Sequence, residues 1–220
     1  MKLSSTEENY IKAIYHLSNA GEKAVSTNTI ADELNTAAAS VSDMIKKLAN
    51  KKLVNYKKYH GVNIDDNGKK VALSIIRKHR LWEVFLVDTL NFNWDEVHEV
   101  AEQLEHIDSP LLTARLDQFL DYPKIDPHGD PIPDEEGNIN VGPQFSLLEL
   151  GLQEEAIITA VENSESLFLQ HLDNLGLRLG VRFKIIERAE FDGSIMIQLE
   201  EDKKIFLSKE VAKNLLVRNL

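Results

Sequence analysis

The sequence predicts a mainly α-helical protein with a small β domain at its C-terminal end, and three observations lead to this fold class. Two short helical segments, separated by a tight turn, precede two short apolar strands, which is the order of a winged helix-turn-helix. Longer segments with apolar residues at helical spacing follow. The last part of the chain contains short runs that are typical of strands, which indicates a small, mostly β barrel.

The composition limits the class of protein. A chain of 220 residues can form one large domain or two to three small ones. It has no cysteine, which excludes disulfides, thiolate catalysis and cysteine-rich zinc sites. No apolar run approaches the roughly 18 residues of a membrane span, and the N-terminal residues do not resemble a signal peptide. We therefore expect a cytoplasmic protein with no membrane partner.

Charge is unevenly distributed along the chain. The whole chain has a net charge of −11, but residues 1–80 hold 14 of the 25 basic and 8 of the 36 acidic residues, a net of +6. Affinity for phosphate depends on the local basic surface and not on the charge of the whole chain. The N-terminal part can therefore bind DNA, although a chance asymmetry between domains is the alternative.

The N-terminal helices are expected at residues 5–19, 27–35 and 39–50, with a break at 36–38. Ser5 and Glu8 have the spacing of a capping box at the start of the first helix. The wing follows, with Leu53, Val54 and Tyr56 in one strand, Val62 and Ile64 in the other, and His60-Gly61 as the turn.

Polar and basic residues on the second helix of the pair and on the wing are candidate DNA contacts. Polar residues at the start of a recognition helix meet base edges, while lysines further along meet phosphates. The alternative is a small helical core with a solvated lysine face. The candidates are Thr27, Thr36, Ser40, Ser42, Asp43, Lys46, Lys47, Lys57 and Lys58.

Three further helices are expected in the middle of the chain. The first starts at Asp65 or Asp66 and runs to about Leu90, and the second covers about 94–107. The third covers about 109–121, with Ser109 as its cap and Pro110 in its first position. Residues 121–144 hold five of the six prolines and indicate an irregular loop or linker.

The C-terminal segment is expected to contain three strands and one helix. VRFKIIERA, SIMIQLE and KKIFLS are typical of strands, with FDG as the turn between the first two, and SESLFLQHLDNLG is typical of a helix.

Histidines and carboxylates in the middle of the chain form a candidate metal-binding pattern. On a helix, His98, Glu102, Glu105 and His106 fall within an arc of about 100°. His79 and Glu83, four residues apart, share a face of the preceding helix. Imidazole and carboxylate without sulfur suit Mn(II), Fe(II), Co(II), Ni(II) or Zn(II). The alternative for each pair is an ordinary surface ion pair.

The chain resembles the diphtheria toxin repressor family of iron- and manganese-dependent regulators. The features that together carry this resemblance are the winged helix, the RKHRL segment, the H-x3-E-x2-EH segment, the PHGDPIP loop and the C-terminal barrel. The resemblance implies a winged-helix domain at 1–73, a helical metal-binding and dimerisation domain at 74–140 and an SH3-like β-barrel at 141–220. It also implies two metal sites in each subunit.

The resemblance assigns residues to these two sites. One site would use His79, Glu83 and His98, and in some members the C-terminal domain adds a ligand, for which Glu162 or Glu165 is the nearest candidate. The other site would use Glu102, Glu105, His106 and Asn9. The carboxylate at 102 is like the manganese-type branch, because iron-type members carry Cys there and Met at the position of Asn9. Manganese-type members carry Asp in place of Asn9 and Glu in place of Lys12, so this chain departs from both branches.

The function that the resemblance implies is a repressor, not an enzyme, which controls metal homeostasis. It would bind double-stranded operator DNA as a homodimer when Mn(II) or Fe(II) is bound, and other divalent first-row metals could act in vitro. Three alternatives stay open: a winged-helix regulator that senses a small organic molecule, a metal-dependent hydrolase, and a protein-interaction adaptor. The C-terminal domain would dock on the metal site, contact the proline-rich loop at 123–133, or only fill space.

Overall fold

The computed structural model describes residues 2–57, 60–140, 142–200 and 203–220. The chain packs as two compact units, and we describe each by itself. The first comprises Met1–His79, Glu102–Thr113 and Pro133–Asn138. The second comprises Arg80–Ala101, Ala114–Ile132 and Ile139–Leu220. Among the helices that the structure describes, none has both the length and the apolar character needed to cross a membrane.

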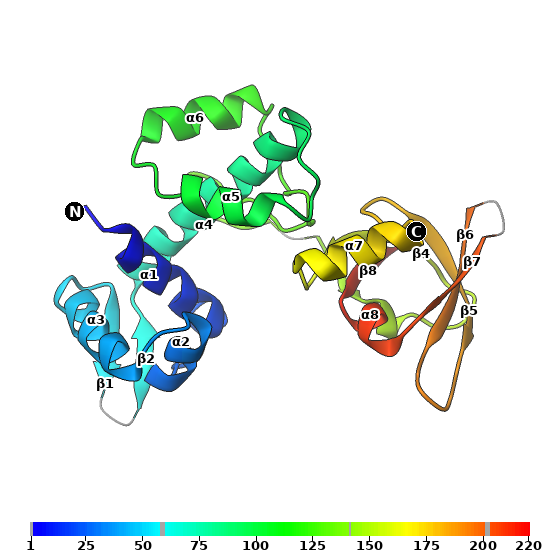
Figure 1. The fold of residues 1–220 in the computed structure, drawn as a ribbon, viewed down its shortest axis with the longest axis horizontal. Helices are drawn as coiled ribbons and strands as arrows, with labels where there is room; N and C mark the ends of the chain where they lie inside the picture. Colours follow the sequence, from blue (N-terminus) through cyan, green and yellow to red (C-terminus); the bar gives the residue numbers. More distant parts are fainter. Residues whose placement is uncertain (1, 58–59, 141, 201–202) are drawn as a thin grey trace. The chain divides into compact units, whose positions relative to one another are not determined.

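A winged helix-turn-helix forms the N-terminal part of the first unit (Figure 1). Its elements are α1 (Ser5–Leu17), α2 (Thr27–Glu33), α3 (Ala38–Asn50), β1 (Val54–Lys57) and β2 (Gly61–Ile64). The two wing strands pair antiparallel. Their core includes Ile11, Ile14, Ile30, Ile45 and Leu48, which are fully buried. The predicted element order is confirmed, because each helix buries the apolar stripe that its spacing predicted.

The capping box of α1 lies one residue earlier than predicted. The cap is Ser4, whose side chain accepts a hydrogen bond from the Glu7 backbone N–H, while the Glu7 carboxylate accepts from the Ser4 N–H. The prediction of Ser5 and Glu8 was wrong because tertiary contacts decide which residues form the capping box. Glu7 is buried and contacts Lys51 on the segment after α3, whereas Glu8 contacts His106.

Glu7 is expected to make the winged helix sensitive to acid. Burial raises the pKa of Glu7, but hydrogen bonds from Lys51, the Ser4 N–H and Lys47 outweigh burial and hold the pKa at about 2, below the ordinary 4.5. A depressed carboxyl pKa stabilises the folded state above pH 4.5, and this contribution is lost as the pH falls toward 2. We expect Glu7→Gln to lower the free energy of unfolding at pH 7, with a smaller difference from the wild type at pH 3, in urea titrations. Glu22→Gln is the control, and a difference that stayed constant with pH would contradict this prediction.

The middle of the chain forms α4 (Asp66–Asp88), α5 (Val97–Leu104) and α6 (Pro110–Phe119). Helix α5 is shorter than the predicted 94–107. Trp94 is buried in the core of the C-terminal sheet, and its Nε1 donates to Asp173, so the residues before Val97 do not join the helix. Because α5 ends at Leu104, Glu105 and His106 lie in the turn that follows it.

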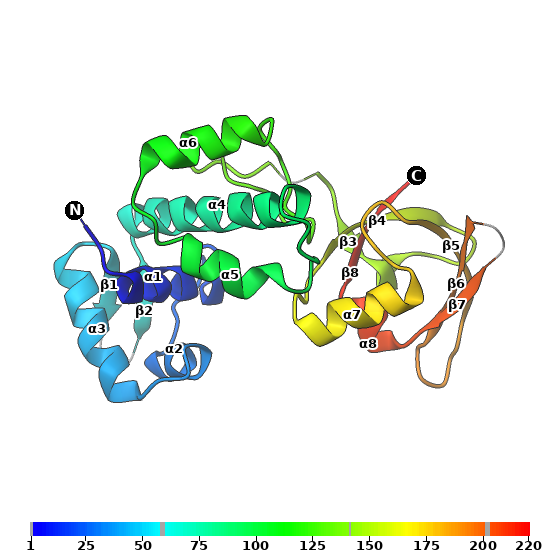
Figure 2. The same ribbon diagram turned by 45° about the horizontal axis from the view of Figure 1, so that its top comes forward.

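The C-terminal part of the second unit is a six-stranded antiparallel sheet in the order β3-β8-β4-β5-β6-β7. Its elements are β3 (Phe145–Ser146), η1 (Leu147–Glu149), β4 (Glu155–Val161), α7 (Ser166–Leu175), β5 (Arg182–Arg188), β6 (Ile195–Leu199), β7 (Lys204–Leu207), α8 (Lys209–Lys213) and β8 (Leu215–Asn219). The three predicted strands and the predicted helix are present. The sequence analysis did not predict β3, β4, β8 or α8. Figure 2 shows α7 and α8 beside the sheet, on which α7 packs through Leu169 and Leu172.

The proline-rich loop is ordered and contacts β4 within the second unit. The side chain of Asp126 accepts hydrogen bonds from the backbone N–H groups of His128 and Asp130, which holds a tight turn. The Val161 N–H donates to the His128 carbonyl at 2.9 Å. Gly129 lies so close to β4 that a Cβ atom there would be 2.1 Å from the Thr159 carbonyl oxygen. This part of the loop therefore docks on the C-terminal sheet through backbone atoms.

Candidate metal centre and nucleic-acid interface

Five of the nine predicted DNA contacts lie on α3, the second helix of the helix-turn-helix pair, and four of these five are exposed. Ser40, Asp43, Lys46 and Lys47 on α3 and Lys57 on β1 are exposed, while Thr27, Thr36 and Ser42 are half-buried. Lys58 lies outside the described residues. Two of the lysines are already paired in the protein, since Lys46 contacts Asp43 at 3.0 Å and Lys47 contacts Glu7 at 3.2 Å.

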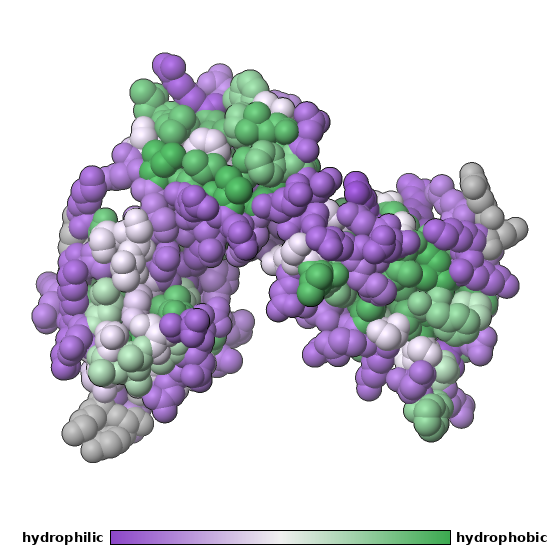
Figure 3. Space-filling model, viewed as in Figure 1, coloured by the Kyte–Doolittle hydropathy of each residue, from purple (hydrophilic) through white to green (hydrophobic). Residues whose placement is uncertain are grey.

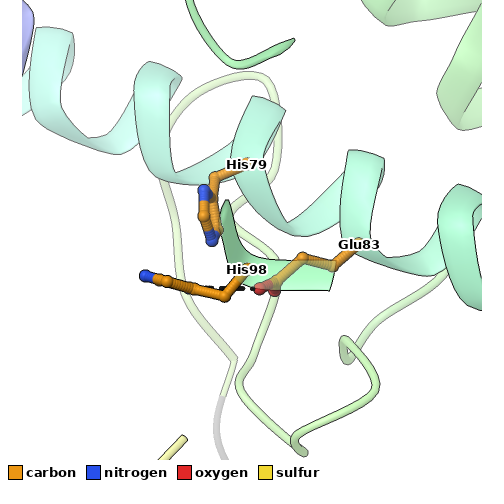
Figure 4. Close-up of side chains that lie close together, drawn as sticks. All are labelled: His79, Glu83 and His98. Atoms are coloured by element: carbon orange, nitrogen blue, oxygen red, sulfur yellow. Dashed lines mark ion pairs between the residues drawn. The ribbon is translucent and has the colours of Figure 1, made fainter. Parts of the chain in front are cut away.

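Two of the predicted metal ligands come from neighbouring turns of α4 and a third from the start of α5. Figure 4 shows His79 and Glu83 projecting from α4 toward His98. Each of the three offers a ligand atom, and these atoms lie within 4.8 Å of one another. His98 Nδ1 is 3.5 Å from a Glu83 carboxylate oxygen. His79 and Glu83 are buried and His98 is exposed, so the group opens to solvent on one side.

A carboxylate fixes the orientation of His79. Its Nδ1 lies 2.6 Å from Glu105 Oε2, so Nε2 is the ring nitrogen that remains for the group with Glu83. A carboxylate bound to the far nitrogen of a histidine is the usual support for a metal-ligating imidazole.

Glu83 also belongs to a second group, with Asp126 and His128, which the sequence analysis did not predict. All three residues are buried, and their ligand atoms again lie within 4.8 Å of one another. His128 Nδ1 is 3.7 Å from Glu83 Oε2, and Nε2 is 2.8 Å from the Trp94 carbonyl oxygen. Because a carbonyl only accepts, Nε2 carries a proton, and Nδ1 is the nitrogen that faces Glu83.

Two side chains of this second group have shifted pKa values because they are buried close to other charged groups. Burial and the charges of Glu83 and Asp130 raise the pKa of Asp126 to about 7. For His128, burial lowers the pKa, but the hydrogen bond and charge of Glu83 outweigh burial and place the pKa above its ordinary value. Buried carboxyl groups that repel one another are favourable surroundings for a cation.

The donor atoms of both groups fit a divalent first-row metal. They are imidazole nitrogens and carboxylate oxygens without sulfur, and they converge from α4, α5 and the loop at 126–130. The signal for His128 was the PHGDPIP segment at 127–133, and Asp126 comes directly before that segment, two residues from His128. Its link to Glu83 depends on how the chain folds back, which periodicity does not report.

The other predicted site is arranged differently, because a lysine lies in it. Lys12 Nζ on α1 is 2.6 and 2.9 Å from the two oxygens of Glu105 and 3.5 Å from Glu102. His106 Nδ1 contacts Glu8 at 2.6 Å, and Asn9 is exposed. Burial raises the pKa of Glu105, but the hydrogen bond from His79 and the charge of Lys12 outweigh burial and hold the pKa below its ordinary value. An ammonium group cannot ligate a metal, so this set of residues does not fit an ion as it stands.

The two candidate ligands from the C-terminal domain are both exposed. Glu162 follows β4 directly, and Glu165 occupies the N-cap position of α7 without a capping hydrogen bond from its side chain. Among the described residues, no group of three possible ligands includes either of them. Glu162 is next to Val161, which is hydrogen-bonded to His128, so it is the one nearer in the chain to the second group.

These features are those expected of a metal-responsive transcriptional regulator, a class in which a winged-helix DNA-binding domain is joined to a helical part with transition-metal ligands. Residues 2–62 match the N-terminal DNA binding domain of the iron dependent repressors, and residues 65–134 match their metal binding and dimerisation domain. Residues 145–219 match the FeoA domain. The chain belongs to the iron-dependent repressor family, as its resemblance to the diphtheria toxin repressor implied. This is a family of transcriptional repressors, so the metal-dependent hydrolase considered from the sequence is excluded.

Relatives and solved structures agree with this family. The iron-dependent repressor IdeR of Mycobacterium tuberculosis is 32% identical over 132 residues, which cover 60% of this chain and 57% of IdeR. The match therefore spans little more than half the length of that relative. A solved manganese-dependent transcriptional repressor in complex with manganese is 33% identical, with a TM-score of 0.87, over 97% of this chain and 100% of its own. ScaR with bound Zn²⁺ is 31% identical, with a TM-score of 0.78, over 97% and 99% of the two chains.

Proposed function

We propose that this protein is a repressor that binds operator DNA as a homodimer when Mn(II) or Fe(II) is held by the residues around Glu83, and so controls metal homeostasis. Its parts are the winged helix at 1–73, the metal-binding and dimerisation domain at 74–140 and the SH3-like domain at 141–220. The relatives named above support both metals, because one is a manganese-dependent repressor and another an iron-dependent one.

The observation that carries this proposal is the place of Glu83 in two groups of ligands. One carboxylate oxygen lies near His98 and the other near His128, so Glu83 links α5 and the loop at 126–130. A bound metal would supply positive charge to these crowded acids. Glu83, Asp126 and His128 would then hold the loop against α4, in the part of the chain that matches the dimerisation domain.

DNA recognition is assigned to α3 and the wing. Thr36, Ser40 and Asp43 lie at the start of α3 or just before it, where a recognition helix meets base edges. Asp43 can accept a hydrogen bond from a cytosine amino group, and its pairing with Lys46 limits its repulsion of phosphate. Lys46 and Lys57 are exposed and are assigned to phosphates, with Lys47 in part, since it also contacts Glu7.

Operator binding in the presence and absence of metal tests the function. Fluorescence anisotropy with a labelled operator is measured in Mn(II), in Fe(II) under anaerobic conditions, and in chelator. We expect metal to increase affinity by about 5–150-fold, the usual range of allosteric coupling. Lys46→Gln is expected to weaken operator binding equally with and without metal. This variant therefore distinguishes a loss of DNA contact from a loss of the metal response. Equal affinity in metal and chelator would refute the proposal.

Glu162 is the residue that we propose as the additional C-terminal ligand. It is one residue from the Val161–His128 hydrogen bond, whereas Glu165 is at the start of α7, further along the chain. We expect Glu162→Ala to weaken Mn(II) binding by about tenfold, in the range seen when the support of a metal site is removed. Glu165→Ala should leave it unchanged. Calorimetric titration with Mn(II) measures both, and equal affinities for the two variants would remove Glu162 from the site.

Helix α6 is the surface that we propose for dimerisation. Figure 3 shows apolar side chains gathered over the surface that bears α6, where Leu111 and Phe119 are each 65% exposed. We expect Leu111→Asp to raise the dimer dissociation constant by about 30-fold or more, because an interface would bury an unpaired charge. Analytical ultracentrifugation measures the constant. Leu152→Asp, at a leucine 60% exposed on the C-terminal domain, is the control that should leave the dimer intact.

A further inference from the structure

Lys12 on α1 contacts two carboxylates, that of Glu102 in the last turn of α5 and that of Glu105 in the turn after it. The Lys12 side chain is 16% exposed, and Nζ contacts both oxygens of Glu105, at 2.6 and 2.9 Å. Nζ is also 3.5 Å from Glu102. The ammonium group therefore lies between the two carboxylates that the family resemblance assigned to a metal.

The positive charge of Lys12 can take the place of a metal ion beside Glu105. The Glu105 side chain is fully buried, and a buried carboxylate needs a positive partner. Lys12 supplies that charge and has three N–H donors for the surrounding oxygens. It offers no lone pair, and its charge repels a second cation. The charge of the buried Glu105 carboxylate is thus balanced without metal.

The same contact links α1 to one proposed ligand on α4, His79. Glu105 Oε2 is 2.6 Å from His79 Nδ1, so one carboxylate is shared by Lys12 and a proposed metal ligand. Helix α1 also reaches the turn after α5 through Glu8 and His106, at 2.6 Å. All of these residues belong to the first unit of the chain.

We propose that Lys12 is a tethered cation that takes the place of an ion at Glu102 and Glu105, so that the metal response of this protein comes only from the residues around Glu83. The claim that the metal response comes only from the residues around Glu83 rests on the proposed function. The claim that Lys12 takes the place of an ion does not. Glu105 is then a positioning residue for His79, and Lys12 holds α1 to it whether or not metal is present.

The number of bound ions tests the proposal. Free Mn(II) is counted by electron paramagnetic resonance during titration of the full chain. We expect Lys12→Glu to bind one more equivalent than the wild type, because it removes the blocking charge and adds a ligand oxygen. Lys12→Met, which removes the charge and adds no ligand oxygen, shows whether loss of the charge alone is enough to admit the ion. Lys51→Glu is the matched control, since Lys51 also contacts a buried carboxylate, Glu7, and should leave the count unchanged.

A second measurement uses no metal. In chelator, amide hydrogen exchange in α1 and in residues 102–108 should be faster in Lys12→Gln than in the wild type, because one of the contacts that join them is lost. The proposal is overturned if Lys12→Glu, folded by circular dichroism, binds as many ions as the wild type. It is also overturned if Glu102→Ala with His106→Ala removes one ion from the wild-type count. A wild type that binds no Mn(II), with one ion gained by Lys12→Glu, would support the tethered cation and refute the proposed function.

Discussion

Glu83→Gln is expected to abolish metal-activated operator binding while it leaves the affinity in chelator unchanged. Glutamine keeps the shape of the side chain but removes the charge that both ligand groups share. The expected loss is the whole metal response, about 5–150-fold in affinity. Operator anisotropy with and without Mn(II) measures it, and a Mn(II) titration of the same variant shows whether the loss begins at metal binding.

The control for this variant is Glu99→Gln, which removes the same charge from an exposed position on α5. It is expected to keep the metal response of the wild type. A Glu83→Gln protein that still binds its operator more tightly in Mn(II) would place the switch elsewhere in the chain.

Gly129→Ala is expected to cause the largest loss of stability among the substitutions considered for this protein. Gly129 has φ of +89°, in the region that disfavours side chains. A Cβ atom would also lie 2.1 Å from the Thr159 carbonyl oxygen and 2.5 Å from the Ala160 Cα, both backbone atoms that cannot turn away. We expect a loss of about 3–5 kcal/mol, the upper end of single-substitution effects. Urea denaturation measures the loss, and weaker Mn(II) binding should accompany it, since Asp126 and His128 lie on the same loop.

Gly180→Ala distinguishes the cost of the positive φ from the cost of the steric clash with β4. Gly180 has φ of +84°, but nothing lies within 4 Å of a Cβ atom there. It should cost only the strain of the left-handed conformation, about 1–2 kcal/mol. If the two variants lost equal stability, the close approach of the loop to β4 would not be what makes Gly129 necessary.

The sequence was sufficient for elements whose signal is local. Helices α1, α2 and α3 and the wing lie where apolar periodicity placed them, because each periodic face is buried in one core. His79 and Glu83 were expected on one face for a similar reason, since four residues make about one helical turn. The types of donor atom also follow directly from a chain without cysteine.

Where several local patterns compete, the sequence alone does not decide which of them forms, and the tertiary structure does. Ser4 caps α1 in place of Ser5 because Glu7 contacts Lys51, 44 residues away. Helix α5 begins at Val97 because Trp94 is buried in the C-terminal core. Strands β4 and β8 are neighbours in the sheet although more than 50 residues separate Thr159 from Leu216, whose carbonyl its hydroxyl contacts.

The amino-acid sequence by itself determined where α1, α2, α3 and α4 form, which faces they bury, and that any metal here is bound by nitrogen and oxygen. Only the tertiary structure decided that Asp126 and His128 join Glu83, and that Lys12 reaches Glu105 from 93 residues away. The physical reason is that periodicity records how one segment meets its surroundings, whereas the partner of a buried charge depends on which distant segments the folded core brings together.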